Sequence, residues 1–98
     1  MEYTINEWQA ELRRRFGDRP EDYRFVCPHC GRVNRGSEFI ERGAHADDVA
    51  QMCIGRVDKG LGCDWVAYGL FGTLFKGDAI IMADGRRKMV FPMDRSSD

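Results

Sequence analysis

Four cysteines are the residues of this chain whose type and spacing could do chemistry. Two residues separate Cys27 from Cys30, and nine residues separate Cys53 from Cys63. A tight turn lets two such cysteines reach one ion, and four thiolates complete a tetrahedral zinc shell at about 2.3 Å from each sulfur. The pattern therefore predicts one structural Zn²⁺ bound by Cys27, Cys30, Cys53 and Cys63.

The pair Cys27 and Cys30 is also typical of a thiol oxidoreductase. That chemistry needs a strand before the first cysteine and a helix directly after the second, because the helix N-terminus lowers the pKa of the thiol. A strand is expected over residues 23–26, but residues 31–36 are a poor helix start. Zinc is therefore favoured, and a redox site remains a distant alternative.

No other group of residues indicates catalysis. His29 is expected to be exposed in the turn between two cysteines, and His45 is expected in a loop. A shell closed by four thiolates leaves no position for an activated water. The chain also lacks a nucleophile elbow and a P-loop. We therefore expect a protein that is not an enzyme and takes no small-molecule substrate.

The elements that would position the cysteines begin with a helix over residues 4–17. Thr4 and Glu7 have the spacing of a capping box, and Gly17 follows the last apolar position. Apolar residues recur at helical spacing. They are Ile5, Trp8, Leu12 and Phe16.

Residues 22–75 are expected to form the four-cysteine core, with a strand over 64–68 leading away from Cys63. Residues 78–93 are expected to form a β-hairpin. A two-residue turn at Asp84 and Gly85 would place Ile80 opposite Met89.

The tail, residues 94–98, is polar and expected to be frayed. The prediction is one α+β domain over residues 1–98, a zinc-ribbon-like core of β-hairpins with an amphipathic N-terminal helix.

Charge and hydropathy limit the possible partners. The chain carries 15 Lys and Arg against 16 Asp and Glu, a net charge of −1. This balance gives a weak field for attracting nucleic acid or anionic lipid.

No apolar run is long enough to span a membrane, and residues 1–7 do not look like a signal peptide. We therefore expect a cytoplasmic protein, in which two structural disulfides are disfavoured.

Two sets of residues are candidate binding surfaces. Basic residues near the cysteines would contact nucleic acid if they gather around the metal; they are Arg32, Arg35, Arg56 and Lys59. An aromatic stretch is the candidate protein-binding surface, although a small domain needs most of its aromatics inside. It comprises Trp65, Tyr68, Phe71 and Phe75. The even charge favours a protein partner over nucleic acid.

The order of several short motifs resembles a family of small phage and prophage proteins of unknown function with a four-cysteine core. The motifs are Trp8, Arg15-Phe16-Gly17, Arg24-Phe25-Val26-Cys27-Pro28, Cys30-Gly31, Cys53-Ile54-Gly55-Arg56, Gly62-Cys63-Asp64-Trp65 and Tyr68-Gly69-Leu70-Phe71. The resemblance covers roughly residues 4–75, and the C-terminal hairpin matches least.

This resemblance implies a bacteriophage source, a host-cell cytoplasmic location and a zinc-binding fold, but no activity. Small phage proteins commonly bind host or phage macromolecules, and some inhibit bacterial defence systems. The favoured function is therefore a non-catalytic zinc protein that binds a host or phage protein. A DNA- or RNA-binding zinc-ribbon regulator is the alternative.

Overall fold

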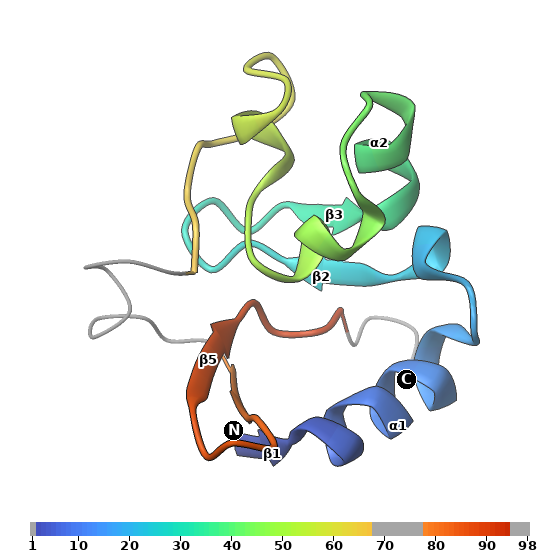
Figure 1. The fold of residues 1–98 in the computed structure, drawn as a ribbon. Coiled ribbons are helices and arrows are strands. Elements are labelled where there is room, and N and C mark those ends of the chain that lie inside the picture. The colour runs from blue at the N-terminus through green and yellow to red at the C-terminus, as the bar shows by residue number, and fades with distance from the viewer. Residues whose placement is uncertain (1, 68–77, 95–98) are drawn as a thin grey trace.

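A computed structural model describes residues 2–67 and 78–94 of the chain. Over these residues the protein is a small α+β fold with two helices and two small sheets (Figure 1). Its elements are β1 (Glu2–Thr4), α1 (Ile5–Phe16), β2 (Arg24–Val26), β3 (Val33–Arg35), α2 (Gly36–Glu41), β4 (Asp78–Ile81) and β5 (Arg87–Val90). Short 3₁₀ helices cover Pro20–Asp22, Ala46–Ala50 and Ile54–Arg56.

Some expectations fall outside the described residues. The aromatic residues Tyr68, Phe71 and Phe75 do so, as does the tail from residue 95 onward. Neither helix in the described ranges combines the length and the apolar character that crossing a bilayer requires.

The N-terminal helix begins with the capping box that the sequence predicted. The hydroxyl oxygen of Thr4 accepts the backbone N–H of Glu7 at 3.2 Å, and the Glu7 carboxylate accepts the N–H of Thr4 at 2.8 Å. Leu12 is the buried residue of α1. The other predicted apolar positions of this helix are half-buried and pack against the core. Gly17 ends the helix with a φ of 85°.

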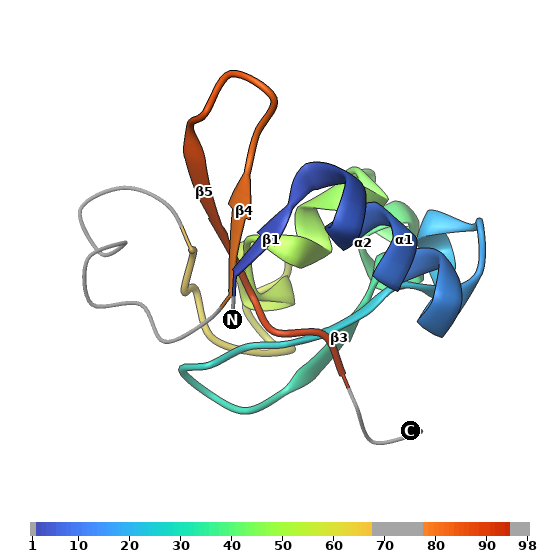
Figure 2. The same cartoon turned by 90° about the horizontal axis from the view of Figure 1, so that it is seen from below.

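A strand that the sequence did not indicate precedes this helix. β1 pairs in parallel with β4, with Tyr3 opposite Ile80, and the three-stranded sheet has the order β1-β4-β5. Seen from below, the β4–β5 hairpin projects beyond β1 and α1 (Figure 2). Three residues are too few for an alternating pattern, so this pairing depends on contact between the two ends of the chain.

The hairpin register differs from the expected one. Ile80 lies opposite Lys88 instead of Met89. The loop has three residues, 83–85, and its last residue is a glycine with a φ of 86°. A three-residue loop of this kind is a common hairpin connection, and it shifts the register by one residue. As a result Val90 shares the face of Ile80, and both side chains are buried.

The segment after β5 joins the two sheets. It runs along β2, between the part of the molecule that holds α2 and the part that holds α1 (Figure 1). The N–H of Val26 donates to the carbonyl of Pro92 at 2.8 Å, and the N–H of Asp94 donates to Arg24 at 2.9 Å. Asp94 is 6 % exposed and its carboxylate accepts from the Arg24 guanidinium. Asp94 therefore belongs to the core structure and was wrongly assigned to a frayed tail.

The core is continuous across both sheets. Its cluster of buried residues includes Cys27 and Cys53, so two of the four thiols are part of the hydrophobic interior. The largest fully buried apolar side chains come from residues 25–54 and 80–93, so both sheets and the segments between them contribute. They are Phe25, Phe39, Ile54, Ile80, Phe91 and Met93.

Candidate metal centre

The first two cysteines lie in the turn that joins β2 to β3. The N–H of Cys27 donates to the carbonyl of Arg32 at 2.9 Å, and the N–H of Gly31 donates to the carbonyl of Cys27 at 2.8 Å. Gly31 has a φ of 78°, which a residue with a side chain rarely adopts. This tight turn points the thiols of Cys27 and Cys30 to one side of the hairpin end.

The other two cysteines lie at the base of a loop that two antiparallel segments close. The N–H of Cys53 donates to the carbonyl of Trp65 at 3.0 Å, and the N–H of Ala67 donates to Gln51 at 2.7 Å. Within residues 64–67, the described part of the strand expected over residues 64–68, the pairing is one bridge, between Val66 and Met52. This closure accounts for the nine-residue spacing, because it brings the two ends of the loop together.

The sulfur atoms have the spacing of a tetrahedral zinc shell. Sγ of Cys27 lies 3.5 Å from Sγ of Cys63, and Sγ of Cys30 lies 3.8 Å from Sγ of Cys53. All four sulfurs lie within 4.8 Å of one another, and all four cysteines are free thiols. Zinc–sulfur bonds of about 2.3 Å place the sulfurs of a regular tetrahedron about 3.8 Å apart. The four side chains therefore fit one zinc ion.

Two glycines let the chain segments approach closely at this centre. A Cβ on Gly55 would lie 2.0 Å from the carbonyl oxygen of Cys63, and a Cβ on Gly62 would lie 2.9 Å from Sγ of Cys53. Neither position accommodates a side chain without movement of the backbone or of a ligand. In the motif Cys-Ile-Gly-Arg, which begins at Cys53, Gly55 lies against Cys63. In the motif Gly-Cys-Asp-Trp, Gly62 lies against Cys53. Each motif thus contains one cysteine and the glycine that makes room for the other cysteine.

Asn34 is a buried polar residue beside the centre that the sequence did not reveal. Its amide NH₂ donates to Sγ of Cys53 at 3.7 Å, and its side-chain oxygen accepts from the N–H of Ile54 at 3.3 Å and from Arg32 at 2.9 Å. Asn34 is 0 % exposed, whereas both neighbours in β3 are exposed. Nothing in its residue type indicated this burial. Such outer contacts orient ligands and tune the metal.

We expect Asn34→Leu to weaken zinc binding by roughly 10–100-fold, the usual effect of removing a hydrogen bond to a ligand. The change keeps the branched shape of the side chain, although leucine is bulkier, and leaves the N–H of Ile54 and the Arg32 guanidinium without this acceptor. Competition against a chromogenic chelator measures the affinity. Val33→Thr, on an exposed neighbour, is the control and should bind zinc as the unchanged chain does. Equal affinities for both variants would show that Asn34 does not support the centre.

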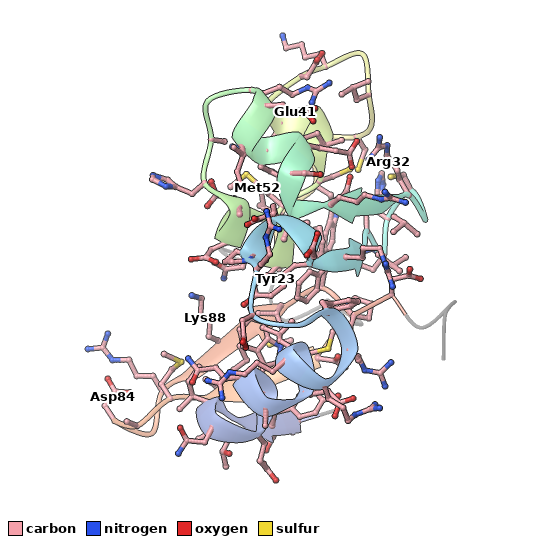
Figure 3. All side chains as sticks on the ribbon, turned by 90° about the vertical axis from the view of Figure 1, so that its right-hand side faces the viewer. Tyr23, Arg32, Glu41, Met52, Asp84 and Lys88 are labelled. Carbon is pink, nitrogen blue, oxygen red and sulfur yellow. The ribbon has the colours of Figure 1, made fainter. Side chains whose placement is uncertain are left out.

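Arg32 is held beside the thiols by an ion pair. Its guanidinium donates to both carboxylate oxygens of Glu38, at 2.7 and 3.1 Å. This bidentate pair lowers the pKa of Glu38 and raises that of Arg32. Four thiolates around Zn²⁺ carry a net negative charge, which a nearby cation stabilises. In Figure 3 Arg32 lies at the turn that joins β2 to β3.

The protein shifts the pKa values of Cys27, Cys30 and Cys63 in different directions. Burial raises the pKa values of Cys27 and Cys63. Burial also opposes ionisation of Cys30, but the backbone N–H groups of Arg32 and Cys63 outweigh it and lower the pKa of Cys30 to about 7. Only thiolates bind zinc, so the metal must displace protons from Cys27 and Cys63, and its affinity falls as the pH is lowered.

The arrangement lacks the helix that a thiol oxidoreductase needs. After Cys30 the chain enters β3, and α2 begins only at Gly36. The first cysteine of the pair, Cys27, is fully buried, whereas a redox nucleophile must be reachable by its substrate. The geometry thus favours metal binding over thiol exchange.

The structure divides the predicted basic residues instead of gathering them. Arg56 and Lys59 line a shallow pocket with Cys63. Arg35 lines a different pocket, beside the C-terminal end of α1. Arg32 is engaged with Glu38.

The fold and the four thiols define a small α+β protein with a four-cysteine site suited to a metal ion. The chain belongs to the VVA0879-like family, whose model matches residues 4–94. The match extends across the C-terminal hairpin, beyond the limit of roughly residue 75 that the motifs indicated. No curated protein and no solved structure matches the chain.

Proposed function

We propose that this protein is a non-catalytic module, folded around one structural Zn²⁺, that acts by binding another protein. The observation that carries the zinc assignment is the approach of four thiols to within 4.8 Å of one another. Four protein ligands close a tetrahedral shell, which is typical of structural zinc; catalytic sites keep one position open.

The distribution of charge supports a protein partner. Of the four basic residues expected at the centre, Arg32 is engaged by Glu38 at 2.7 Å and Arg35 lies on another surface. Arg56 and Lys59 line a pocket with Cys63. The chain as a whole is close to neutral. This is a small positively charged surface for a nucleic-acid-binding protein.

The resemblance to small phage and prophage proteins supports a narrower form of the proposal. In that form the protein is phage-encoded, lies in the host cytoplasm and binds a host or phage protein, for instance as an inhibitor of a bacterial defence system. This narrower form rests on the sequence motifs alone.

Affinity capture from bacterial lysate, with and without nuclease, tests the proposal. We expect the zinc-loaded, tagged chain to retain a protein regardless of nuclease, and the purified pair to form a complex again. Chain treated with a zinc chelator is the control and should lose the partner with the fold. Retention of nucleic acid alone, released by nuclease, would contradict a protein partner.

A second candidate is nucleic-acid binding through the loop between Cys53 and Cys63. Arg56 and Lys59 beside Cys63 favour it, together with the parallel stack of His29 on Trp65, whose ring centres lie 6.0 Å apart. Aromatic faces beside cations are typical of single-strand binding.

On our proposal the zinc-loaded chain should bind a random-sequence oligonucleotide no more tightly than about 0.1 mM at physiological salt, the weak limit of non-specific binding. Fluorescence anisotropy at several salt concentrations measures this. Micromolar binding that falls steeply with salt, and that is weakened in the variant carrying both Arg56→Gln and Lys59→Gln, would instead establish the second candidate.

A further inference from the structure

The four cysteines of the metal centre differ in their access to solvent. Cys27 and Cys53 are 0 % exposed, Cys63 is half-buried and Cys30 is exposed. Cys30 lies in the turn between β2 and β3, where residues 28–31 are all exposed. A small reagent in solution therefore reaches Cys30 more easily than the other three cysteines.

A second sulfur lies next to that of Cys30. Sγ of Cys53 is 3.8 Å away, and the bond of a disulfide is about 2.05 Å long, so a movement of about 2 Å would join the two sulfurs. Cys53 is itself shielded from solvent, and the amide of Asn34 contacts its sulfur at 3.7 Å. Redox-sensing cysteines share this arrangement of an accessible thiolate beside a second thiol that reacts with the oxidised first one.

Arg32 places a positive charge close to these sulfurs. A Cβ on Gly62 would lie 2.9 Å from Sγ of Cys53 and 3.4 Å from Cδ of Arg32, so the arginine side chain passes beside the cluster. Cysteines that react with oxidants lie in electropositive, partly exposed surroundings. Zinc ligands are already thiolates, which is the reactive form, so access to solvent decides which of the four an oxidant attacks first.

We propose that the centre is a peroxide-sensitive switch, in which Cys30 is oxidised first, forms a disulfide with Cys53 and thereby opens the zinc shell. This inference rests on the structural zinc of the proposed function. The switch is a stoichiometric change in the fold and needs no catalytic cycle, so the lack of a helix directly after Cys30 does not oppose it.

The reaction consumes one molecule of hydrogen peroxide. The Cys30 thiolate attacks a peroxide oxygen and the O–O bond breaks, which gives a sulfenic acid and hydroxide. The Cys53 thiolate then attacks the Cys30 sulfur, and the S–O bond breaks as the disulfide forms and a second hydroxide leaves. Each sulfur gives up one electron, and the peroxide gains two. Cys27 and Cys63 remain as thiolates, but two ligands do not close a tetrahedral shell, so the chain loses its zinc and the fold that binds the partner.

Titration of the zinc-loaded chain with hydrogen peroxide tests the proposal. A chromogenic chelator reports the released zinc, and mass spectrometry after alkylation of free thiols maps the disulfide. We expect one zinc released and two thiols lost for each peroxide consumed, with Cys30 joined to Cys53. A first disulfide that lacks either of these cysteines would overturn the proposal.

The zinc content before oxidation separates this proposal from the zinc assignment. A folded chain that contains no zinc would contradict the structural zinc itself. A chain that contains one zinc and keeps it under peroxide would overturn the switch and leave the zinc assignment intact.

Matched variants test whether access at Cys30 controls the reaction. Histidine also binds zinc, so a shell of three thiolates and one imidazole can hold the metal. We expect Cys30→His to lose most of the peroxide-driven release of zinc. Cys63→His, the same exchange at a less exposed ligand, keeps Cys30 and Cys53 and should release zinc as fast as the unchanged chain. Equal rates in the two variants would overturn the proposal, and if either variant fails to hold zinc, the disulfide mapped in the unchanged chain decides.

A switch must also be reversible. A disulfide is reducible, whereas a sulfinic acid is not reduced by thiols or phosphines. Treatment of the oxidised chain with a phosphine reductant, followed by addition of zinc, should therefore restore one zinc per chain and cooperative melting. Failure to regain zinc would show that peroxide damages the centre irreversibly and would overturn the proposal.

Discussion

Cys63→Ser is expected to leave the chain without zinc and largely unfolded. A serine hydroxyl is a poor zinc ligand, and three thiolates leave the shell open. Zinc binding in small domains is worth about 10–16 kcal/mol at pH 7, whereas a whole domain is stable by about 5–15 kcal/mol. Loss of one ligand thus removes an energy as large as the total stability. Two of the thiols, Cys27 and Cys53, lie in the hydrophobic core, so the loss reaches the rest of the fold.

Circular dichroism melting and elemental analysis measure this effect. The unchanged chain should contain one zinc per molecule and should unfold when a strong chelator is added. His29→Ser is the matched control, because His29 lies exposed between two cysteines and is not among the four clustered thiols. It should melt cooperatively with its zinc retained. A stable, zinc-loaded Cys63→Ser protein would show that Cys63 is not a ligand.

The second large effect is expected from Gly55→Ala, a change of one methyl group. The new Cβ would lie 2.0 Å from the carbonyl oxygen of Cys63 and 2.4 Å from the carbonyl of Gly62. Both obstacles are backbone atoms, so the loop must open, and Cys63 must move away from Cys53. We expect a loss of about 3 kcal/mol or more, at the upper end of overpacking effects.

Gly60→Ala is the control for this prediction. Its Cβ would meet only a side-chain oxygen of Asp58, at 3.7 Å, which is an ordinary contact. Both glycines lie between Cys53 and Cys63 and neither has a positive φ, so neither variant strains the backbone and the main difference is the space around the new Cβ. Urea unfolding of the zinc-loaded proteins compares them. Equal midpoints for Gly55→Ala and Gly60→Ala would mean that Gly55 is not closely packed against Gly62 and Cys63.

Local chemistry made some features predictable. The helix start at Thr4 follows from a hydrogen-bonded pair only three residues apart. The turn at Cys27 is local too, because Gly31 supplies its positive φ. The approach of Cys53 to Cys63 was predictable for another reason. Four cysteines in one short chain indicate that all four bind the same zinc ion, even when nine residues separate two of them.

Other features depend on contacts that no local pattern encodes. β1 exists because Glu2–Thr4 pairs with β4 from the other end of the chain. The hairpin register follows from one extra loop residue, which the dipeptide Asp84 and Gly85 does not reveal. Asn34 supports the metal centre only because β3 passes beside Cys53.

The sequence by itself determined the chemistry of this protein: four soft ligands, a capped amphipathic helix and a nearly neutral charge. These three features follow from residue types and from spacings of a few residues along the chain. The tertiary structure alone decided that Arg32 forms an ion pair with Glu38, that Arg35 lines a different pocket from Arg56 and Lys59, and that α1 and the hairpin enclose a cavity. Those outcomes depend on how the two sheets pack, because packing sets which distant side chains meet.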